Sequence, residues 1–126
     1  MFSMQQVFDI VITWIIAQHG EHCSGSDGAC KYRASSANYA STRCVIGLFM
    51  TEQEFDEFVL VHSTQSCGVS SMEYKQIPVL LRHVNREFLI DLQYLHDSKL
   101  DKEDRRRQMK AIAKKWELND TVISLY

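Results

Sequence analysis

The chain has 126 residues, of which 45% are hydrophobic and 24% are charged. This length is enough for one compact core and too short for two ordinary domains, so we expect a single domain over residues 1–126. The formal net charge of −2 excludes the strong basic excess that non-specific nucleic-acid binding requires. Any basic binding site must therefore be local, and sequence-specific nucleic acid is not the expected partner.

The first predicted element is a helix over residues 4–19, which Gly20 ends. Its apolar residues fall on nearly every side of a helical wheel: Val7, Phe8, Ile10, Val11, Ile12, Trp14, Ile15 and Ile16. Such a helix must be covered on most faces. It is predicted to be a central core helix, and the alternative is a helix that pairs with another copy. Because one small core cannot easily cover so much apolar surface, we expect a homo-oligomer.

The same N-terminal stretch lacks the features of a targeting segment. It has no basic leader and no small-residue cleavage site, and Asp9 and Thr13 interrupt its apolar run. It is typical of neither a signal peptide nor a membrane span. We therefore expect a cytoplasmic protein with no membrane partner, whose four cysteines are thiols or metal ligands rather than disulfides.

The middle of the chain is predicted to hold the non-helical part of the fold. Residues 21–29 have a turn-forming composition. Residues 30–33 and 42–48 are interpreted as two short strands of a hairpin, joined by residues 34–41. Thr51 and Glu54 have the spacing of a capping box, which predicts a short helix over residues 52–58.

Two helices are predicted in the C-terminal half. Apolar residues at steps of three or four predict a main helix over residues 78–96, with Pro78 in its first turn. A last helix begins near Asp101 and has a short apolar stripe formed by Met109, Ile112, Ala113 and Trp116. Residues 118–126 are predicted to be a strand or a packed tail. The predicted fold class is α+β, mainly α, with three substantial helices around a short hairpin or irregular segment.

Histidine and cysteine side chains gather in the N-terminal half as candidate zinc ligands: His22, Cys23, Cys30 and Cys44, with His19 nearby. Zinc takes thiolate and imidazole ligands in tetrahedral geometry. The segment lacks the paired Cys-x2-Cys spacing of typical zinc sites, so the main expectation is no cofactor, with the cysteines as small buried apolar groups.

The sequence contains no recognisable catalytic motif. A cysteine nucleophile needs a base beside its thiol, as His22 next to Cys23 would provide. Adjacent residues rarely point their side chains at each other, and no oxyanion-hole signature accompanies this pair. His96, with Asp91 and Asp97, has the alternative explanation that a helix C-terminus favours a histidine charge. The balance favours a protein that is not an enzyme, with a metal- or thiol-dependent enzyme as the alternative.

Two polar patches are candidate partner-binding sites. One lies on the last helix, where Arg107, Lys110 and Lys114 share a face at steps of three and four. These three belong to a longer basic series: Arg105, Arg106, Arg107, Lys110, Lys114 and Lys115. The other patch consists of Tyr32, Arg33, Tyr39 and Arg43, residue types that are enriched in binding hot spots. Each patch has a plainer alternative, a solvated face for the first and internal packing for the second.

Five stretches occur in an order that resembles a group of small, uncharacterised proteins of tailed bacteriophages. They are Gly-Ala-Cys-Lys-Tyr-Arg at 28–33, Arg-Cys-Val-Ile-Gly-Leu-Phe at 43–49, the acidic stretch at 52–57, Asp-Leu-Gln-Tyr-Leu-His-Asp at 91–97 and Met-Lys-Ala-Ile-Ala-Lys-Lys-Trp at 109–116. The likeness covers about two thirds of the chain.

The resemblance implies a context rather than an activity. Small phage accessory proteins often bind and disable a host component, such as a nuclease, a defence complex or a signalling nucleotide. The expectation is therefore a non-enzymatic protein in the host cell cytoplasm that binds and inhibits a host protein. A protein that sequesters a small nucleotide, with arginines from two copies closing over its phosphates, is the remaining alternative.

Overall fold

The computed structural model describes residues 2–17, 45–54, 56–57, 77–98 and 100–126. Its longest elements are the helices α1 (Met4–Ala17), α4 (Arg86–Asp97) and α5 (Lys102–Lys115). The short elements are helix α2 (Val45–Leu48) and the 3-10 helices η4 (Val79–Leu81) and η5 (Thr121–Leu125). The prediction of a mainly helical fold with three substantial helices is confirmed. The α+β assignment is not supported, because none of the described residues is in a strand.

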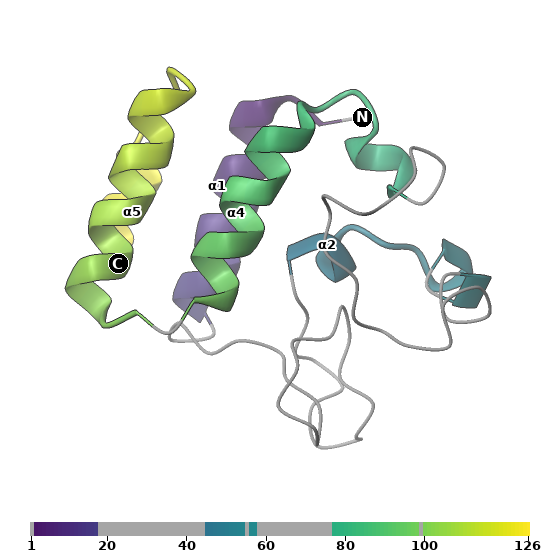
Figure 1. The fold of residues 1–126 in the computed structure, drawn as a ribbon, viewed down its shortest axis with the longest axis horizontal. Coiled ribbons are helices and arrows are strands. Elements are labelled where there is room, and N and C mark those ends of the chain that lie inside the picture. Colours follow the sequence, from purple (N-terminus) through teal and green to yellow (C-terminus); the bar gives the residue numbers. More distant parts are fainter. Residues whose placement is uncertain (1, 18–44, 55, 58–76, 99) are drawn as a thin grey trace.

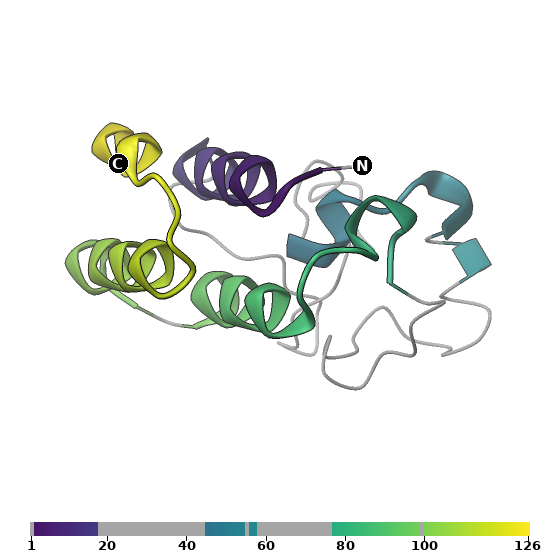
Figure 2. The same cartoon turned by 90° about the horizontal axis from the view of Figure 1, so that it is seen from above.

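The helices lie in two layers around a shared apolar core. Helices α4 and α5 lie side by side and antiparallel in one layer (Figure 1), and α1 with η5 forms the other (Figure 2). Helix α1 contacts both α4 and η5, and α5 contacts the same two elements. The side chains buried between the layers are Val7, Phe8, Val11, Ile12, Ile15, Phe88, Leu89, Leu92, Leu95, Met109, Ile112, Ala113 and Ile123. The prediction that residues 4–19 form a core helix is confirmed up to Ala17, and residues 18–20 lie outside the described ranges.

Helix α2 corrects the predicted hairpin. Residues 42–48 were predicted to be a strand, but Val45–Leu48 is helical, and the Phe49 amide donates to the Ile46 carbonyl at 3.1 Å. Ile46, Phe49 and Met50 are buried, and Phe49 meets the Phe2 ring edge-to-face at 5.9 Å. One helical turn buries side chains at i, i+3 and i+4, and this packing outweighs the β propensity of Val-Ile. The other predicted strand and its connection, residues 30–41, lie outside the described residues.

The capping box at Thr51 is confirmed. The Thr51 amide donates to Glu54 Oε1 and the Glu54 amide donates to Thr51 Oγ1, both at 3.1 Å. Residues 52–54 and 56–57 are helical as predicted. The second carboxylate oxygen of Glu54 accepts the Val79 amide at 2.9 Å. Glu54 therefore also holds η4 against this short helix.

The predicted main helix begins later than the sequence indicated. Pro78 precedes the 3-10 helix η4, and the chain then turns before Asn85 caps α4 by accepting the Glu87 amide at 2.8 Å. Asn85 has φ −57° and ψ 129°, an extended conformation that ends any helix arriving from Pro78. The apolar spacing continues across this break because Leu81, Val84 and Phe88 all face the core. A regular spacing of buried residues therefore did not require one continuous helix.

The C-terminal residues form a packed tail, one of the two forms predicted, and not a strand. Gln5 of α1 holds this tail through its side-chain amide, which donates to the Asn119 carbonyl at 3.1 Å and accepts the Asn119 amide at 2.8 Å. The following 3-10 helix η5 buries Ile123 against α1 and α5. These contacts hold the tail and η5 beside α1 and so complete the second layer of the fold.

Helix α5 ends in a Schellman motif, with Glu117 in the position that normally favours glycine. The Leu118 amide donates to the Ala113 carbonyl at 2.8 Å and the Glu117 amide to the Lys114 carbonyl at 3.3 Å. Glu117 has φ 56°, in the left-handed region where a Cβ atom is crowded by the neighbouring carbonyl. The tail thus leaves α5 through a strained residue.

Replacing Glu117 with glycine should stabilise the protein. Glycine adopts positive φ without steric cost, and this gain exceeds its greater freedom in the unfolded chain, so we expect the free energy of unfolding to rise by about 0.5–1 kcal/mol. Urea unfolding followed by circular dichroism measures the change, with Glu117→Ala as the matched control that keeps the Cβ atom. A Glu117→Gly variant no more stable than the alanine control would show that the left-handed conformation carries no strain.

Candidate functional site

The exposed side of helix α5 carries the basic face, which we define as Arg107, Lys110 and Lys114. The helix begins at its cap Asp101, whose side chain accepts the Asp104 amide at 2.8 Å, close to the predicted start. Met109 and Ile112 are buried, whereas all three basic side chains are exposed. The shared face predicted for the three basic residues therefore points away from the buried residues of the helix.

Arg105, the first member of the basic series, belongs to the core. Its side chain is only 4% exposed. One guanidinium nitrogen donates to the Leu95 carbonyl at 2.8 Å, and the other donates to the carbonyls of Ser98 and Leu100 at 3.3 and 3.2 Å. These carbonyls lie at the end of α4 and in the turn before α5, and the Ser98 carbonyl also accepts the Leu100 amide at 3.0 Å. Arg105 therefore fastens the two helices together.

Three further cations of α5 have partners within the chain. Arg106 pairs with Glu103 and donates to the Tyr126 carbonyl at 3.0 Å. Lys115 pairs with Asp91 of α4 at 2.9 Å, and Arg107 pairs with Asp104 at 2.8 Å. The Arg107 side chain remains 76% exposed in this pair, so water screens the interaction and its contribution to stability is small.

Lys110 and Lys114 differ from the other cations of the helix. Both are exposed, and no ion pair or hydrogen bond joins either ammonium group to any of the described residues. They lie one helical turn apart, about 6 Å along the axis. Like charges at this spacing destabilise a helix slightly. A negatively charged group brought close to them would relieve that repulsion.

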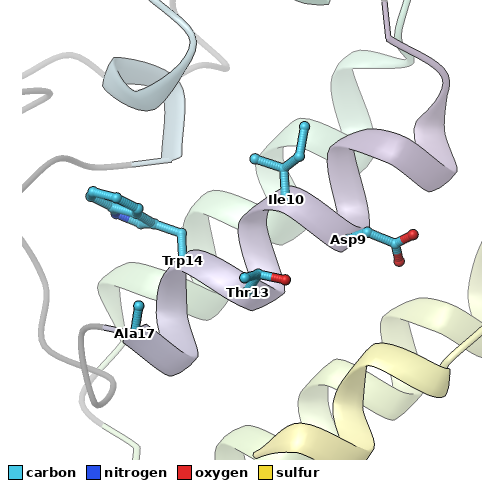
Figure 3. Close-up of a pocket in the computed structure, with 5 residues that line it drawn as sticks. All are labelled: Asp9, Ile10, Thr13, Trp14 and Ala17. Carbon is cyan, nitrogen blue, oxygen red and sulfur yellow. The ribbon is translucent and has the colours of Figure 1, made fainter.

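An open groove of about 370 Å³ runs along the outer side of α1. It is lined by Asp9, Ile10, Thr13, Trp14 and Ala17 (Figure 3). The side chains of Trp14 and Asp9 project to opposite sides of the helix (Figure 3). Among the described residues of this lining, Asp9 is the only titratable group, and its carboxylate accepts a hydrogen bond from Gln5 at 2.9 Å. The described part of the groove is thus lined mainly by apolar atoms, with Asp9 and Thr13 as its polar side chains.

Comparison with known proteins adds no family to these observations. No protein-family model, no curated protein and no solved structure matches the chain. None of the described helices is long and apolar enough to cross a membrane.

Most of the other predicted site residues lie outside the described ranges. These are the second polar patch, Tyr32, Arg33, Tyr39 and Arg43, and the candidate zinc ligands, His22, Cys23, Cys30 and Cys44. Within the described ranges, no group of three or more histidine, cysteine, aspartate or glutamate side chains is placed to hold a metal ion. The zinc hypothesis stays a prediction about residues 19–44.

Asp91, which the sequence analysis grouped with His96, has a structural role. The Asp91 carboxylate accepts hydrogen bonds from Lys115 and from the Trp116 indole, both at 2.9 Å. It therefore links α4 to α5. His96 is completely buried in the last turn of α4, where a solvent-borne substrate does not reach it.

Proposed function

We propose that this chain is a non-enzymatic binding protein that contacts an acidic surface of another protein through the basic face of α5. The observation that carries the proposal is the difference between Lys110 and Lys114 and the other cations of the helix. Those others are engaged within the chain, whereas these two project into solvent with no counter-charge among the described residues. They are available to a partner at little cost to the fold.

The shape of the basic face favours a protein partner over a small phosphate compound. Its three side chains form a row along one convex helix, and Arg107 and Lys114 are about 10 Å apart along the axis. A bound phosphate is normally surrounded by converging donors, such as helix N-termini or several arginines. A row of separated cations instead suits a row of carboxylates on a protein surface.

The resemblance to bacteriophage proteins supports a more specific proposal. A small phage accessory protein with this surface would act in the host cytoplasm by binding and inhibiting a host factor, with a component of host defence as the candidate class of target. Inhibition by binding requires a stable surface and no catalytic group. The helical hairpin that carries the basic face provides such a surface.

The proposal predicts that charge reversal separates binding from folding. The triple variant Arg107→Glu, Lys110→Glu, Lys114→Glu should bind its partner more weakly by about 2–5 kcal/mol, because it replaces attraction by repulsion at the contact. The free energy of unfolding should change by only about 0.5 kcal/mol, since the three side chains are exposed. The partner is first captured from a lysate of the bacterial host, identified by mass spectrometry and purified, and its affinity is then measured by calorimetry.

Two controls make this test specific. Lys102 is a cation of the same helix whose ammonium nitrogen lies over the Tyr126 ring, 5.2 Å from the ring centroid. Reversing this charge with Lys102→Glu should leave the affinity for the partner within about twofold. Substituting lysines for the contacting acids of the partner should restore binding to the triple variant. An unchanged affinity in the folded triple variant would reject the basic face and move the proposed contact to Tyr32, Arg33, Tyr39 and Arg43.

A further inference from the structure

Tyr94 is an exposed aromatic residue on the outer side of α4. Its side chain is 65% exposed, and no hydrogen bond, ring contact or cation-π contact joins that side chain to the described residues. The other exposed large apolar side chains of these ranges are Val79, in η4, and Leu125, in η5. Tyr94 is therefore the one of the three that lies on the α4–α5 hairpin.

The register of the two helices places Tyr94 beside α5. The Asp91 carboxylate reaches Lys115 and Trp116 at 2.9 Å, which fixes the antiparallel alignment of α4 and α5 (Figure 1). One turn further along α4 leads to Tyr94, and one turn back along α5 leads to residues 111 and 112. In antiparallel helices these two steps run in the same direction, so Tyr94 lies level with those residues. The exposed residue Ala111 carries only a methyl group there, which leaves room for a partner to approach.

We propose that Tyr94 is the aromatic anchor of the contact made by the basic face, an inference that rests on the proposed function. The contact surface, which we name the hairpin face, then consists of Tyr94, Arg107, Lys110, Ala111 and Lys114. Neighbouring packed helices have axes about 8–10 Å apart, so one protein partner covers Tyr94 and the basic face together. Charge complementarity assigns an acidic protein as the occupant. That partner must also offer an apolar recess for the tyrosine ring, next to the partner's own carboxylates.

The chemistry of the residue supports this role. A tyrosine side chain buries about 150–250 Å² when it is covered. Tyrosine is among the residue types that dominate binding energy at interface centres, where surrounding groups exclude water. The aliphatic stems of Lys110 and Lys114 provide such surroundings while their ammonium groups reach the partner's carboxylates. In this arrangement the basic side chains orient the partner, and Tyr94 slows the dissociation of the complex.

The test uses the full chain and the purified partner from the capture experiment, with association and dissociation rates measured by biolayer interferometry. Tyr94→Ala should raise Kd at least tenfold, mainly through faster dissociation, and should leave the salt dependence of association unchanged. Tyr94→Phe should retain Kd within about threefold, because the ring remains. Leu125→Ala is the matched control for loss of an exposed apolar side chain, with Kd expected within about twofold.

The outcomes separate this inference from the proposed function. A folded Tyr94→Ala variant with unchanged Kd, beside a triple charge variant that fails to bind, overturns the anchor and keeps the basic face. An unchanged Kd for the triple charge variant overturns the proposed function and, with it, the combined hairpin face. Failure to capture any partner that binds the purified chain overturns both.

Discussion

Replacing Arg105 with alanine should lower the free energy of unfolding by about 3–4 kcal/mol, the largest effect expected from any single charged residue of α5. The guanidinium of Arg105 is buried and donates to the carbonyls of Leu95, Ser98 and Leu100. Alanine removes all three of these hydrogen bonds and opens a cavity between α4 and α5. Chemical unfolding in urea, followed by the helix signal in circular dichroism, measures the loss.

Two variants test the cause of this effect. Arg105→Lys keeps the charge but lacks the forked geometry that serves three carbonyls, so we expect it to lose about half as much stability. Arg107→Ala removes a neighbouring arginine that is 76% exposed and should change stability by only about 0.5 kcal/mol. If Arg105→Ala and Arg107→Ala lowered the free energy of unfolding by equally small amounts, Arg105 would be a surface residue and the packing of α4 on α5 would not depend on it.

Replacing Phe88 with alanine should cost about 3–5 kcal/mol of the free energy of unfolding. Phe88 is completely buried in α4, and its ring meets the Trp116 ring edge-to-face at a centroid distance of 5.6 Å. The substitution removes this contact and leaves a cavity where α4 meets the end of α5. The remaining structure fills such a cavity only in part, so most of the packing energy is lost.

The position of Phe88 offers a matched control on the same helix. Tyr94→Ala also removes an aromatic ring from α4, but this ring is 65% exposed, so its loss should cost only about 0.5 kcal/mol. Thermal unfolding of the two variants, monitored by circular dichroism, compares them directly. Equal melting temperatures would contradict an orientation of α4 that buries Phe88 and exposes Tyr94. The same control establishes that the Tyr94→Ala variant is folded when its binding is measured.

Helix starts that depend on neighbouring residues were predictable from the sequence. Thr51 and Glu54 exchange their two capping hydrogen bonds, and Asp101 caps α5 close to the predicted position. The spacing of Met109 and Ile112 also predicted which side of α5 is buried. These features were accessible because the interacting groups are within one or two helical turns, where the helical period alone fixes their geometry.

Features that depend on contacts between distant segments were not predictable in the same way. The apolar period runs from Leu81 through Val84 to Phe88, and it concealed the break at Asn85, because both sides of the break face the same core. Val45–Leu48 was interpreted as a strand because its β propensity is local information, whereas its burial against α4 is not. Tyr94 was missed, although its place on the polar side of the α4 wheel was a signal of exposure.

The sequence by itself determined that the protein is mainly helical, where its capped helices begin and that Arg107, Lys110 and Lys114 share a face away from the core. Only the tertiary structure decided what each cation of α5 does. Arg105 and Lys110 are the same kind of residue to any rule of composition or charge, yet one is buried under three carbonyls and the other is exposed. The physical reason is that the end of α4 and the turn after it present carbonyls to the side of α5 that carries Arg105. The sequence states neither the distance nor the angle between those two helices.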